Sequence, residues 1–260
     1  MMQPAPVLFI SHGAPTFAIE PGELGHQLTQ LGSELTDIDA IVAVSPHWAT
    51  HALRVASQRQ PQTIHDFHGF PEPLYQLQYP APGSPEVAQS VLTALHQAGL
   101  AAEPDPLQGM DHGVWVPLRH LRPDADIPVV CVSLPIDATP QRAWQLGRAL
   151  APLREQRVMV MSTGSLTHNL AEFRGPAVTN TAPYVTDFTQ WIRSAIQARH
   201  QEALLDYREQ APAARRAHPT EEHLLPLFVA LGASTEGDAF DVLSKEVRYG
   251  MLSMESYRWQ

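Results

Sequence analysis

Cysteine is nearly absent from the sequence, which has 260 residues and a single cysteine, Cys131. A lone cysteine excludes an internal disulfide framework and fits a reducing compartment, so we expect a cytoplasmic protein. Cys131 lies inside the apolar run 129–134, which predicts a buried and unreactive thiol rather than a nucleophile. Zinc sites rich in thiolates are thereby excluded.

Basic residues and long apolar runs are also scarce. Lys and Arg number 17 against 27 Asp and Glu, which gives a formal net charge of −10. Because phosphate binding needs clustered Lys and Arg, we expect no nucleic-acid partner. No apolar run reaches the length of a membrane span, and the first residues lack the pattern of a signal peptide, so we expect no membrane partner. The metalloprotease motif HExxH and glycine-rich phosphate loops are absent as well.

Histidine, in contrast, is abundant, with 13 residues against 17 Lys and Arg. Two histidines follow predicted buried strands. Val7–Ile10 is one such strand and is followed by His12. Ile41–Val44 is another, and Pro46 is predicted to end it just before His47, because proline cannot donate to a strand ladder.

The other expected elements come from apolar periodicity and from capping residues. Helices are predicted over residues 23–35, 84–96, 139–153, 183–207 and 220–232, the last kinked by Pro226. Strands are predicted over 128–134, 158–162 and 247–254, with a weaker one at 53–56. Residues 109–118 are expected to be a loop that leads into a short apolar segment. The stretch 60–85 has no period but contains aromatic residues, which is typical of a binding loop or lid.

No linker or repeat divides the chain, so the prediction is one domain over residues 1–260. The alternation of strands and helices predicts an α/β fold with three layers, α/β/α, around a largely parallel central sheet. The helix at 23–35 would join the strands at 7–10 and 41–44 into a parallel β-α-β unit. Ligands of open α/β sheets bind at the carboxyl ends of the strands.

Five histidines are candidates for one site at this edge of the sheet. His12 and His47 follow strands, His168 lies in the loop after the strand at 158–162, His112 lies between Asp111 and Gly113, and His223 is near a helix start. We predict that they form a shared metal or proton-transfer site. Two strand-end histidines with a third protein ligand are typical of non-haem Fe(II) oxygenases, although imidazole ligands also suit zinc, copper and nickel.

The third ligand is open between Glu222 and His223. Neighbours on a helix point about 100° apart, so only one of them would face the site. The remaining histidines are less informative. We expect a surface position for His26, His96, His120 and His200. The positions of His51 and His218 are left open. His65 and His68, in the aromatic stretch, are candidates for substrate contact. Trp48 and Trp115 are either core residues or aromatic walls of a site, with the core as the default.

Seven segments, in order along nearly the whole chain, resemble motifs of the class III extradiol ring-cleavage dioxygenases. They are SHGAP at 11–15, SPHW at 45–48, residues 63–71, residues 79–85, GMDHG at 109–113, GSLTHNL at 164–170 and residues 218–232. The branch of DOPA 4,5-dioxygenase-like proteins is the most similar, and it shares a fold with the catalytic subunit of protocatechuate 4,5-dioxygenase. Pro46 and Ala14 depart from the residues that relatives often carry, and both changes leave the histidines in place.

The resemblance implies a role for each histidine. His12, His47 and His223 match metal ligands, with Glu222 as the alternative because more distant relatives use a glutamate. His168 matches the catalytic histidine, which also approaches the metal when no substrate is bound. His112 matches a second catalytic histidine near the substrate or oxygen. His65, Phe67 and Trp48 are the residues we expect to contact the substrate.

The implied reaction cleaves a catechol ring, DOPA-like or related, next to its two hydroxyls, with Fe(II) and O2, and yields a muconic semialdehyde. A neutral His168 would accept a proton from the catechol. Zn(II) binds imidazole sites more tightly than Fe(II), so zinc is an ion expected in a preparation. Two alternatives remain at this stage: a zinc-dependent hydrolase that uses the same histidines, and a non-catalytic metal-binding protein of the same fold.

Overall fold

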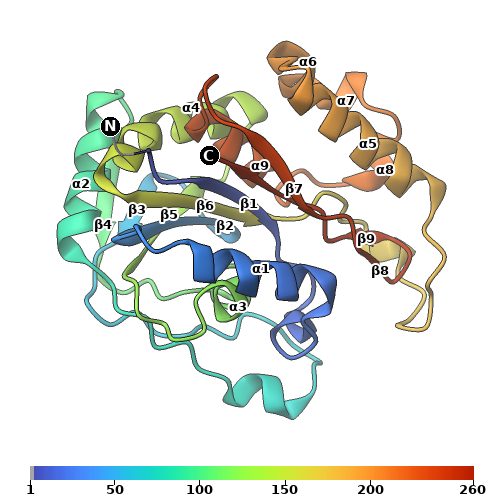
Figure 1. Ribbon diagram of the computed structural model, residues 1–260, viewed down its shortest axis with the longest axis horizontal. Coiled ribbons are helices and arrows are strands. Elements are labelled where there is room, and N and C mark those ends of the chain that lie inside the picture. Colours follow the sequence, from blue (N-terminus) through green and yellow to red (C-terminus); the bar gives the residue numbers. More distant parts are fainter. Residues whose placement is uncertain (1–2) are drawn as a thin grey trace.

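A large central sheet organises the computed structural model, which describes residues 3–260 (Figure 1). Its strands are β1 (Val7–Ser11), β2 (Ala40–Thr50), β3 (Leu53–Ala56), β4 (Ala102–Asp105), β5 (Val129–Pro135), β6 (Val158–Gly164), β7 (Phe240–Ser244) and β10 (Ser256–Trp259). The spatial order is β4-β3-β5-β2-β6-β1-β10-β7. The central run β5-β2-β6-β1 is parallel, and β10 and β7 continue it antiparallel. A separate hairpin contains β8 (Val247–Arg248) and β9 (Leu252–Ser253).

Helices cover both faces of this sheet. The α-helices are α1 (Gly22–Glu34), α2 (Pro85–Gln97), α3 (His112–Leu121), α4 (Pro140–Leu150), α5 (Pro183–Gln197), α6 (Gln201–Leu205), α7 (Tyr207–Gln210), α8 (Ala214–Ala217) and α9 (Leu225–Ala233). Short 3-10 turns are η1 (Pro15–Ala18), η2 (Glu72–Gln76), η3 (Ala151–Gln156) and η4 (Leu170–Glu172). One core contains residues of α2, α4, α5 and α9, and the other contains residues of α1 and α3. The predicted three-layer α/β fold with a largely parallel sheet is therefore confirmed.

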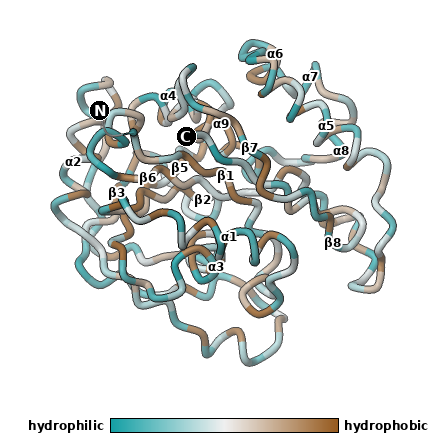
Figure 2. The backbone as a smooth tube through the Cα atoms, viewed as in Figure 1, coloured by the Kyte–Doolittle hydropathy of each residue, from teal (hydrophilic) through white to brown (hydrophobic). Residues whose placement is uncertain are grey.

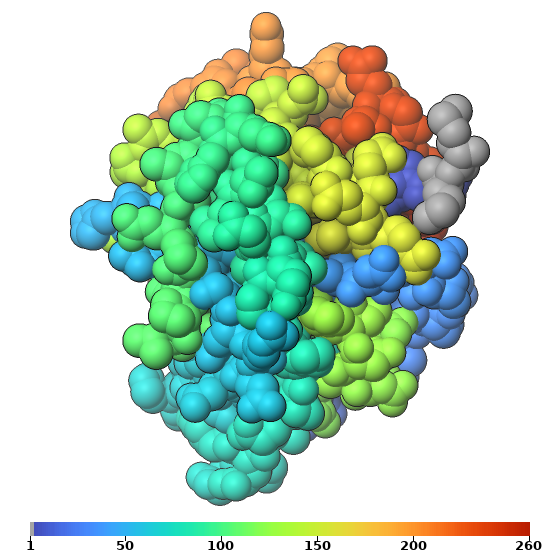
Figure 3. Space-filling model, turned by 90° about the vertical axis from the view of Figure 1, so that its left-hand side faces the viewer, coloured from blue at the N-terminus to red at the C-terminus, as the bar shows by residue number. Residues whose placement is uncertain are grey.

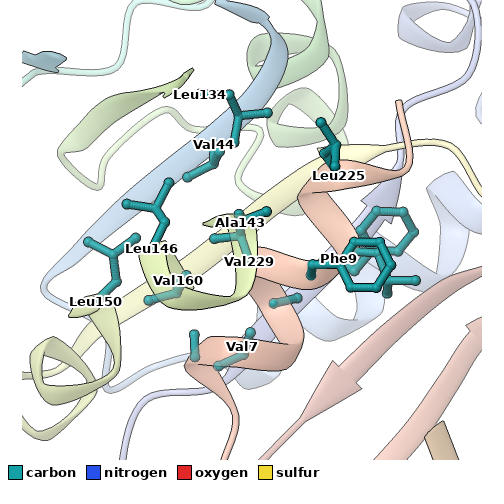
Figure 4. Close-up of a cluster of buried hydrophobic side chains, with 14 of the residues drawn as sticks. Val7, Phe9, Val44, Leu134, Ala143, Leu146, Leu150, Val160, Leu225 and Val229 are labelled. Carbon is teal, nitrogen blue, oxygen red and sulfur yellow. The ribbon is translucent and has the colours of Figure 1, made fainter. Parts of the chain in front are cut away.

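The central strands are buried on both faces, as their unbroken apolar runs predict. Along β1, Val7 and Phe9 belong to the core under α4 and α9, whereas Leu8 and Ile10 belong to the core under α1 and α3. Figure 2 shows these strands as the hydrophobic centre of the chain. Figure 4 shows the first core, in which side chains of α4 and α9 pack over β1 and β6. Cys131 of β5 is buried, and burial raises the pKa of its thiol, in agreement with the prediction of an unreactive cysteine.

Helices α4 and α9 cross at two glycines that allow their backbones to touch. A Cβ atom on Gly147 would lie 2.0 Å from the carbonyl oxygen of Val229, and one on Gly232 would lie 2.0 Å from that of Trp144. No real Cβ sits so close to an oxygen, so a side chain at either position would force the helices apart. The α4–α9 layer therefore depends on both glycines.

We expect Gly232→Ala to lower the free energy of unfolding by about 1–3 kcal/mol, the usual cost of overpacking a core. Gly237→Ala is the matched control, because a Cβ there would meet only Thr235 Oγ1 at 3.9 Å. Urea unfolding of both variants, followed by circular dichroism, measures the difference. Equal stability of the two variants would contradict the close helix crossing.

The order of the central strands differs from the simplest reading of the sequence. Strands β1 and β2 are parallel, as predicted, but β6 lies between them and pairs with both. The helix α1 therefore crosses over one strand position rather than joining neighbours. Sequence order cannot show this, because β6 comes more than a hundred residues later in the chain.

The predicted end of β2 at Pro46 is wrong, since the strand continues to Thr50. Regular pairing does stop there. The β2–β6 ladder ends at Val44, and the β2–β5 register slips from Val44 opposite Val132 to Ala49 opposite Leu134. Residues 45–48 thus bulge out of the ladder, where Pro46 needs no backbone donor. His47 lies in this bulge.

The predictions for three segments need correction. The segment 183–207 is broken after α5, because Arg199 has a left-handed backbone with φ of 55°. Residues 220–224 form a turn, and helix α9 begins only at Leu225. Pro226 lies in the first turn of α9, where no amide is needed, and so it does not kink the helix. The expected loop at 109–118 contains the start of α3, which begins at His112.

The last predicted strand, 247–254, is instead the β8–β9 hairpin, turned at Tyr249 and Gly250 with φ of 55° and 67°. Strands β4, β7 and β10 were not predicted from the sequence. Among residues 3–260, no helix is long and apolar enough to cross a membrane. Residues 60–84 contain only the short turn η2 and one isolated bridge, between Thr63 and Met110, as expected for a loop, and Figure 3 shows them in cyan to teal in the lower part of the molecule.

Candidate metal centre

Three of the predicted histidines converge at the carboxyl ends of the parallel strands. His12 follows β1, His47 lies in the bulge of β2, and His223 lies in the turn before α9. The Nε2 atoms of His12 and His47 are 3.2 Å apart. The ring centre of His223 is 5.5 Å from that of His12 and 5.1 Å from that of His47. One ring nitrogen from each of the three lies within 4.8 Å of the others.

The end of β6 brings His223 to this place. Gly164 is the last residue of β6, and a Cβ atom on it would lie 2.2 Å from the carbonyl oxygen of His223. The backbone N–H of Ser165 donates to the same oxygen at 2.8 Å, and the backbone N–H of His12 donates to the oxygen of Gly164 at 3.0 Å. A glycine at the strand end thus lets the 220–224 turn lie directly against it.

His168 lies beside this group. Its ring stacks on that of His223, with centres 3.5 Å apart and planes 9° from parallel. Its backbone N–H donates to the oxygen of Ala217 at 2.8 Å. Burial, followed by the neighbouring His223, lowers the pKa of His168 to about 3. The ring is therefore neutral near pH 7.

The electrostatics of His12 and His47 suit a metal. Burial lowers the pKa of His12 well below its ordinary value and that of His47 to about 3, so both rings are neutral and can offer a lone pair. Two nitrogens that bind one zinc ion at about 2.0–2.1 Å, at tetrahedral or octahedral angles, lie roughly 3 Å apart. The observed separation of 3.2 Å matches this value. The donor set therefore fits a divalent transition metal.

Two carboxylates lie behind the histidine rings. Asp66 Oδ2 is 3.0 Å from Nδ1 of His112 and 3.6 Å from Nδ1 of His47. Glu222 Oε1 is 3.3 Å from Nδ1 of His223. A carboxylate on the far nitrogen orients a metal-binding histidine and makes it a better ligand. The hydrogen bond from His223 lowers the pKa of Glu222 to about 2, so this carboxylate is ionised near pH 7.

His112 occupies the N-terminus of α3, close to the other rings. Its ring centre is 4.1 Å from that of His47 and 5.4 Å from that of His12. The preceding residue, Asp111, is buried and accepts a hydrogen bond from the Ser45 hydroxyl at 2.7 Å, which ties α3 to the β2 bulge. Burial raises the pKa of Asp111 to about 6.

The three residues expected to contact a substrate lie in different settings. Phe67 is buried, with its ring edge-on to His112 at 5.7 Å between centres. The ring of His65 contacts those of Phe67 and Trp115, with distances between ring centres of 5.7 and 5.6 Å. Trp48 and Trp115 both belong to the apolar core under α1 and α3, which was the default expectation for both. The position of Trp48 therefore supports packing rather than substrate contact.

The other histidines lie outside the cluster or at its edge. Those exposed at the surface are His26, His51, His68, His96 and His200. The surface expectation for His120 is wrong, since its ring is half-buried against Phe17 and its Nε2 lies 2.7 Å from the Phe17 oxygen. His218 is fully buried, with Nε2 2.9 Å from the Leu166 oxygen.

Sequence reasoning did not identify Asp66, Asp111 or Ser45 as part of the site. Asp66 lies in the aperiodic stretch 60–85, and its only signal was membership of the segment 63–71 that resembles a family motif. Asp111 adjoins His112 and Ser45 adjoins Pro46, but an adjacent position does not show which way a side chain points. Buried carboxylates beside histidine rings become visible only in the fold.

Comparisons with known proteins agree with this geometry. The family described as the catalytic LigB subunit of aromatic ring-opening dioxygenase matches residues 6–258. The 4,5-DOPA dioxygenase extradiol of Beta vulgaris is 35% identical over 255 residues, which is 96% of this chain and 95% of that protein. The protein of the same name from Escherichia coli K12 is 35% identical over 256 residues, 96% of this chain and 93% of that protein.

More distant similarities point the same way. Dioxygenase tasH of Hapsidospora irregularis is 30% identical over 280 residues, 98% of this chain and 85% of that protein. The crystal structure of an uncharacterized protein from Escherichia coli K12 superimposes with a TM-score of 0.81 at 30% identity, covering 98% of this chain and 99% of the other. The motifs, the fold and these similarities together show that the chain belongs to the LigB family of extradiol aromatic ring-opening dioxygenases.

Proposed function

We propose that the protein cleaves a catechol of the DOPA type next to its two hydroxyls, with Fe(II) and O2, and releases a muconic semialdehyde. The observation that carries this proposal is the convergence of His12, His47 and His223 with His168 stacked beside them. The name shared by several relatives, 4,5-DOPA dioxygenase extradiol, supports a DOPA-like substrate.

In this proposal His12, His47 and His223 hold the metal through neutral ring nitrogens. When bound, Fe(II) supplies the redox chemistry with O2 and makes the catechol hydroxyls more acidic. Zn(II) fits the same ligands but has no redox chemistry, so a zinc-loaded protein is expected to be inactive in ring cleavage. The three-histidine donor set contains no thiolate and suits either ion, with Zn(II) bound more tightly than Fe(II).

The chain's own residues then handle the proton and the ring. His168, which burial keeps neutral, accepts a proton from a catechol hydroxyl. His112 forms a hydrogen bond to the second hydroxyl or to oxygen. Phe67, within the 60–85 segment, stands edge-on to His112. Together with His65 it would cover the aromatic ring of the substrate and limit the entry of water.

The choice of His223 over Glu222 as the third ligand can be tested with a matched pair of variants. Glu222 is about half exposed and its Oε1 lies 3.3 Å from Nδ1 of His223, which supports a role behind the ligand rather than as the ligand. We expect Glu222→Gln to weaken Zn(II) binding by at most about 10–100-fold, the usual effect of an outer partner. His223→Ala should weaken it further, because a ligand is lost. Calorimetric titration of both variants with Zn(II) compares their affinities. A larger loss of affinity in Glu222→Gln than in His223→Ala would make Glu222 the ligand.

The direct experiment is anaerobic loading with Fe(II), followed by a panel of catechols in air-saturated buffer. O2 uptake together with a yellow semialdehyde product is the expected result. A zinc-loaded sample is the control and should show neither. Turnover of esters or amides by the zinc form, without any O2 uptake by the iron form, would replace the proposal with a hydrolase.

A further inference from the structure

Asp66 holds His112 by two contacts at once. Its Oδ1 accepts a hydrogen bond from the backbone N–H of His112 at 2.8 Å, and its Oδ2 lies 3.0 Å from the ring Nδ1 of the same residue. Backbone and ring of one histidine are thus fixed by the two oxygens of one carboxylate. The His112 side chain is only 8% exposed, whereas that of Asp66 is 24% exposed at the rim of the site.

We propose that Asp66 is a positioning residue that keeps the ring proton of His112 on Nδ1 and leaves Nε2 as a bare acceptor facing the substrate. An ionised carboxylate can only accept hydrogen bonds, so the Nδ1 atom that faces it must carry the proton. In a neutral imidazole the other nitrogen then has a lone pair. The consequence is chemical: Nε2 accepts a hydrogen bond from a hydroxyl.

This inference rests on the proposed function only for its last step, and there it sharpens the role of His112. A bare Nε2 suits the second hydroxyl of a catechol, which brings its own proton. It does not suit dioxygen, which needs a donor. Asp66 therefore assigns His112 to the substrate rather than to oxygen.

The contact of Asp66 with His47 is weaker. Nδ1 of His47 is 3.6 Å from Asp66 Oδ2, beyond a normal hydrogen bond, whereas the two contacts with His112 are within range. The ring of Phe67, the next residue, stands edge-on to that of His112, with the ring centres 5.7 Å apart. We therefore expect loss of the carboxylate to affect His112 more than the metal ligand.

Asp66→Asn is the informative substitution because it keeps the shape and removes one acceptor. An amide offers one oxygen and one NH2 group, so it cannot accept both protons of His112. If the amide nitrogen faces Nδ1, the ring proton moves to Nε2. We expect kcat of the iron-loaded variant to fall by about 10–100-fold, as is usual for a lost outer partner, with Zn(II) affinity close to wild type.

The matched control is Glu72→Gln in the same segment. Glu72 is exposed in η2, where its Oε1 accepts from Gln76 Nε2 at 3.1 Å, and it is remote from the histidine rings in the contacts described. The kcat of the Glu72→Gln variant should equal that of the wild type. In a His112→Ala background, Asp66→Asn should add little further loss, since two residues that act through one another are not additive.

The closing measurement is the ¹⁵N NMR spectrum of the histidine rings in the zinc-loaded protein, with His112 assigned by comparison with His112→Ala. The expected result is that His112 is protonated on Nδ1 alone in the wild type and that its ring proton changes position in Asp66→Asn. A proton on Nε2 in the wild type would overturn the inference, even if the protein cleaves catechols. The expected spectrum without any ring cleavage would instead overturn the proposed function and leave the role of Asp66 intact.

Discussion

Replacing His168 with alanine should lower kcat for catechol cleavage by about 10²–10⁴-fold, the range for loss of a general base. The metal should stay bound, because His12, His47 and His223 remain. The physical reason lies in the stacked position of His168, 3.5 Å from the ring of His223, where burial keeps it neutral.

The measurement is O2 uptake by iron-loaded protein at saturating catechol, with metal content determined on the same sample. His200→Ala is the control, since His200 is exposed at the start of α6 and should leave kcat unchanged. Full activity in His168→Ala would remove this residue from the mechanism. Loss of metal together with activity would show that His168 is itself needed to bind the metal.

Replacing His12 with alanine should weaken metal binding by more than about a hundredfold, and lower ring cleavage with it. Structural zinc sites with four ligands bind with about 10–16 kcal/mol, so one ligand contributes about 3 kcal/mol, or more than about a hundredfold in affinity. His12 is buried at 2% exposure, and its Nε2 is the nitrogen that faces His47 at 3.2 Å. Water can enter the space left by alanine but cannot restore an anchored nitrogen.

Calorimetric titration with Zn(II) checks this expectation without any assay of activity. His26→Ala is the matched control, because His26 is exposed on α1 and should bind zinc as the wild type does. Metal affinity that is equal in both variants would contradict the assignment of His12 as a ligand. Circular dichroism of the metal-free variants shows whether each is folded.

The fold was predictable where the local signal is strong. Apolar runs fully buried on both faces gave β1, β5 and β6. The helix starts predicted at 84 and 139 were also correct, since the hydroxyls of Ser84 and Thr139 accept from the backbone N–H groups of Val87 and Arg142 and cap these helices. The break at Arg199 carries no such signal, because it lies between residues that suit a helix. Short strands at the sheet edge or next to it, such as β7 and β10, form by pairing with their neighbours, which the sequence does not display.

The candidate site shows the same division. His12, His47 and His168 could be placed at one edge because each follows a buried strand and parallel strands share a carboxyl end. The identity of the strand between β1 and β2 was not accessible, nor was the bulge that carries His47. The first residues of the helix predicted over 220–232 are instead a turn over 220–224, yet His223 reaches the site, since Gly164 lets that turn lie against β6. The role of Asp66 could not be predicted, because the residues that it contacts, His47 and His112, are remote from it in sequence.

The most direct test of extradiol cleavage is the mass of the product formed by iron-loaded protein from DOPA, or a related catechol, under ¹⁸O2. The account predicts one O2 consumed per catechol and a ring-opened product that gains both atoms of one dioxygen molecule, measured before the aldehyde exchanges its oxygen with water or condenses with the DOPA amine. A hydroxylated product that keeps its ring, or release of hydrogen peroxide with an intact ring, would contradict it. No O2 consumption with any catechol, in a sample shown to hold Fe(II), would contradict it as well.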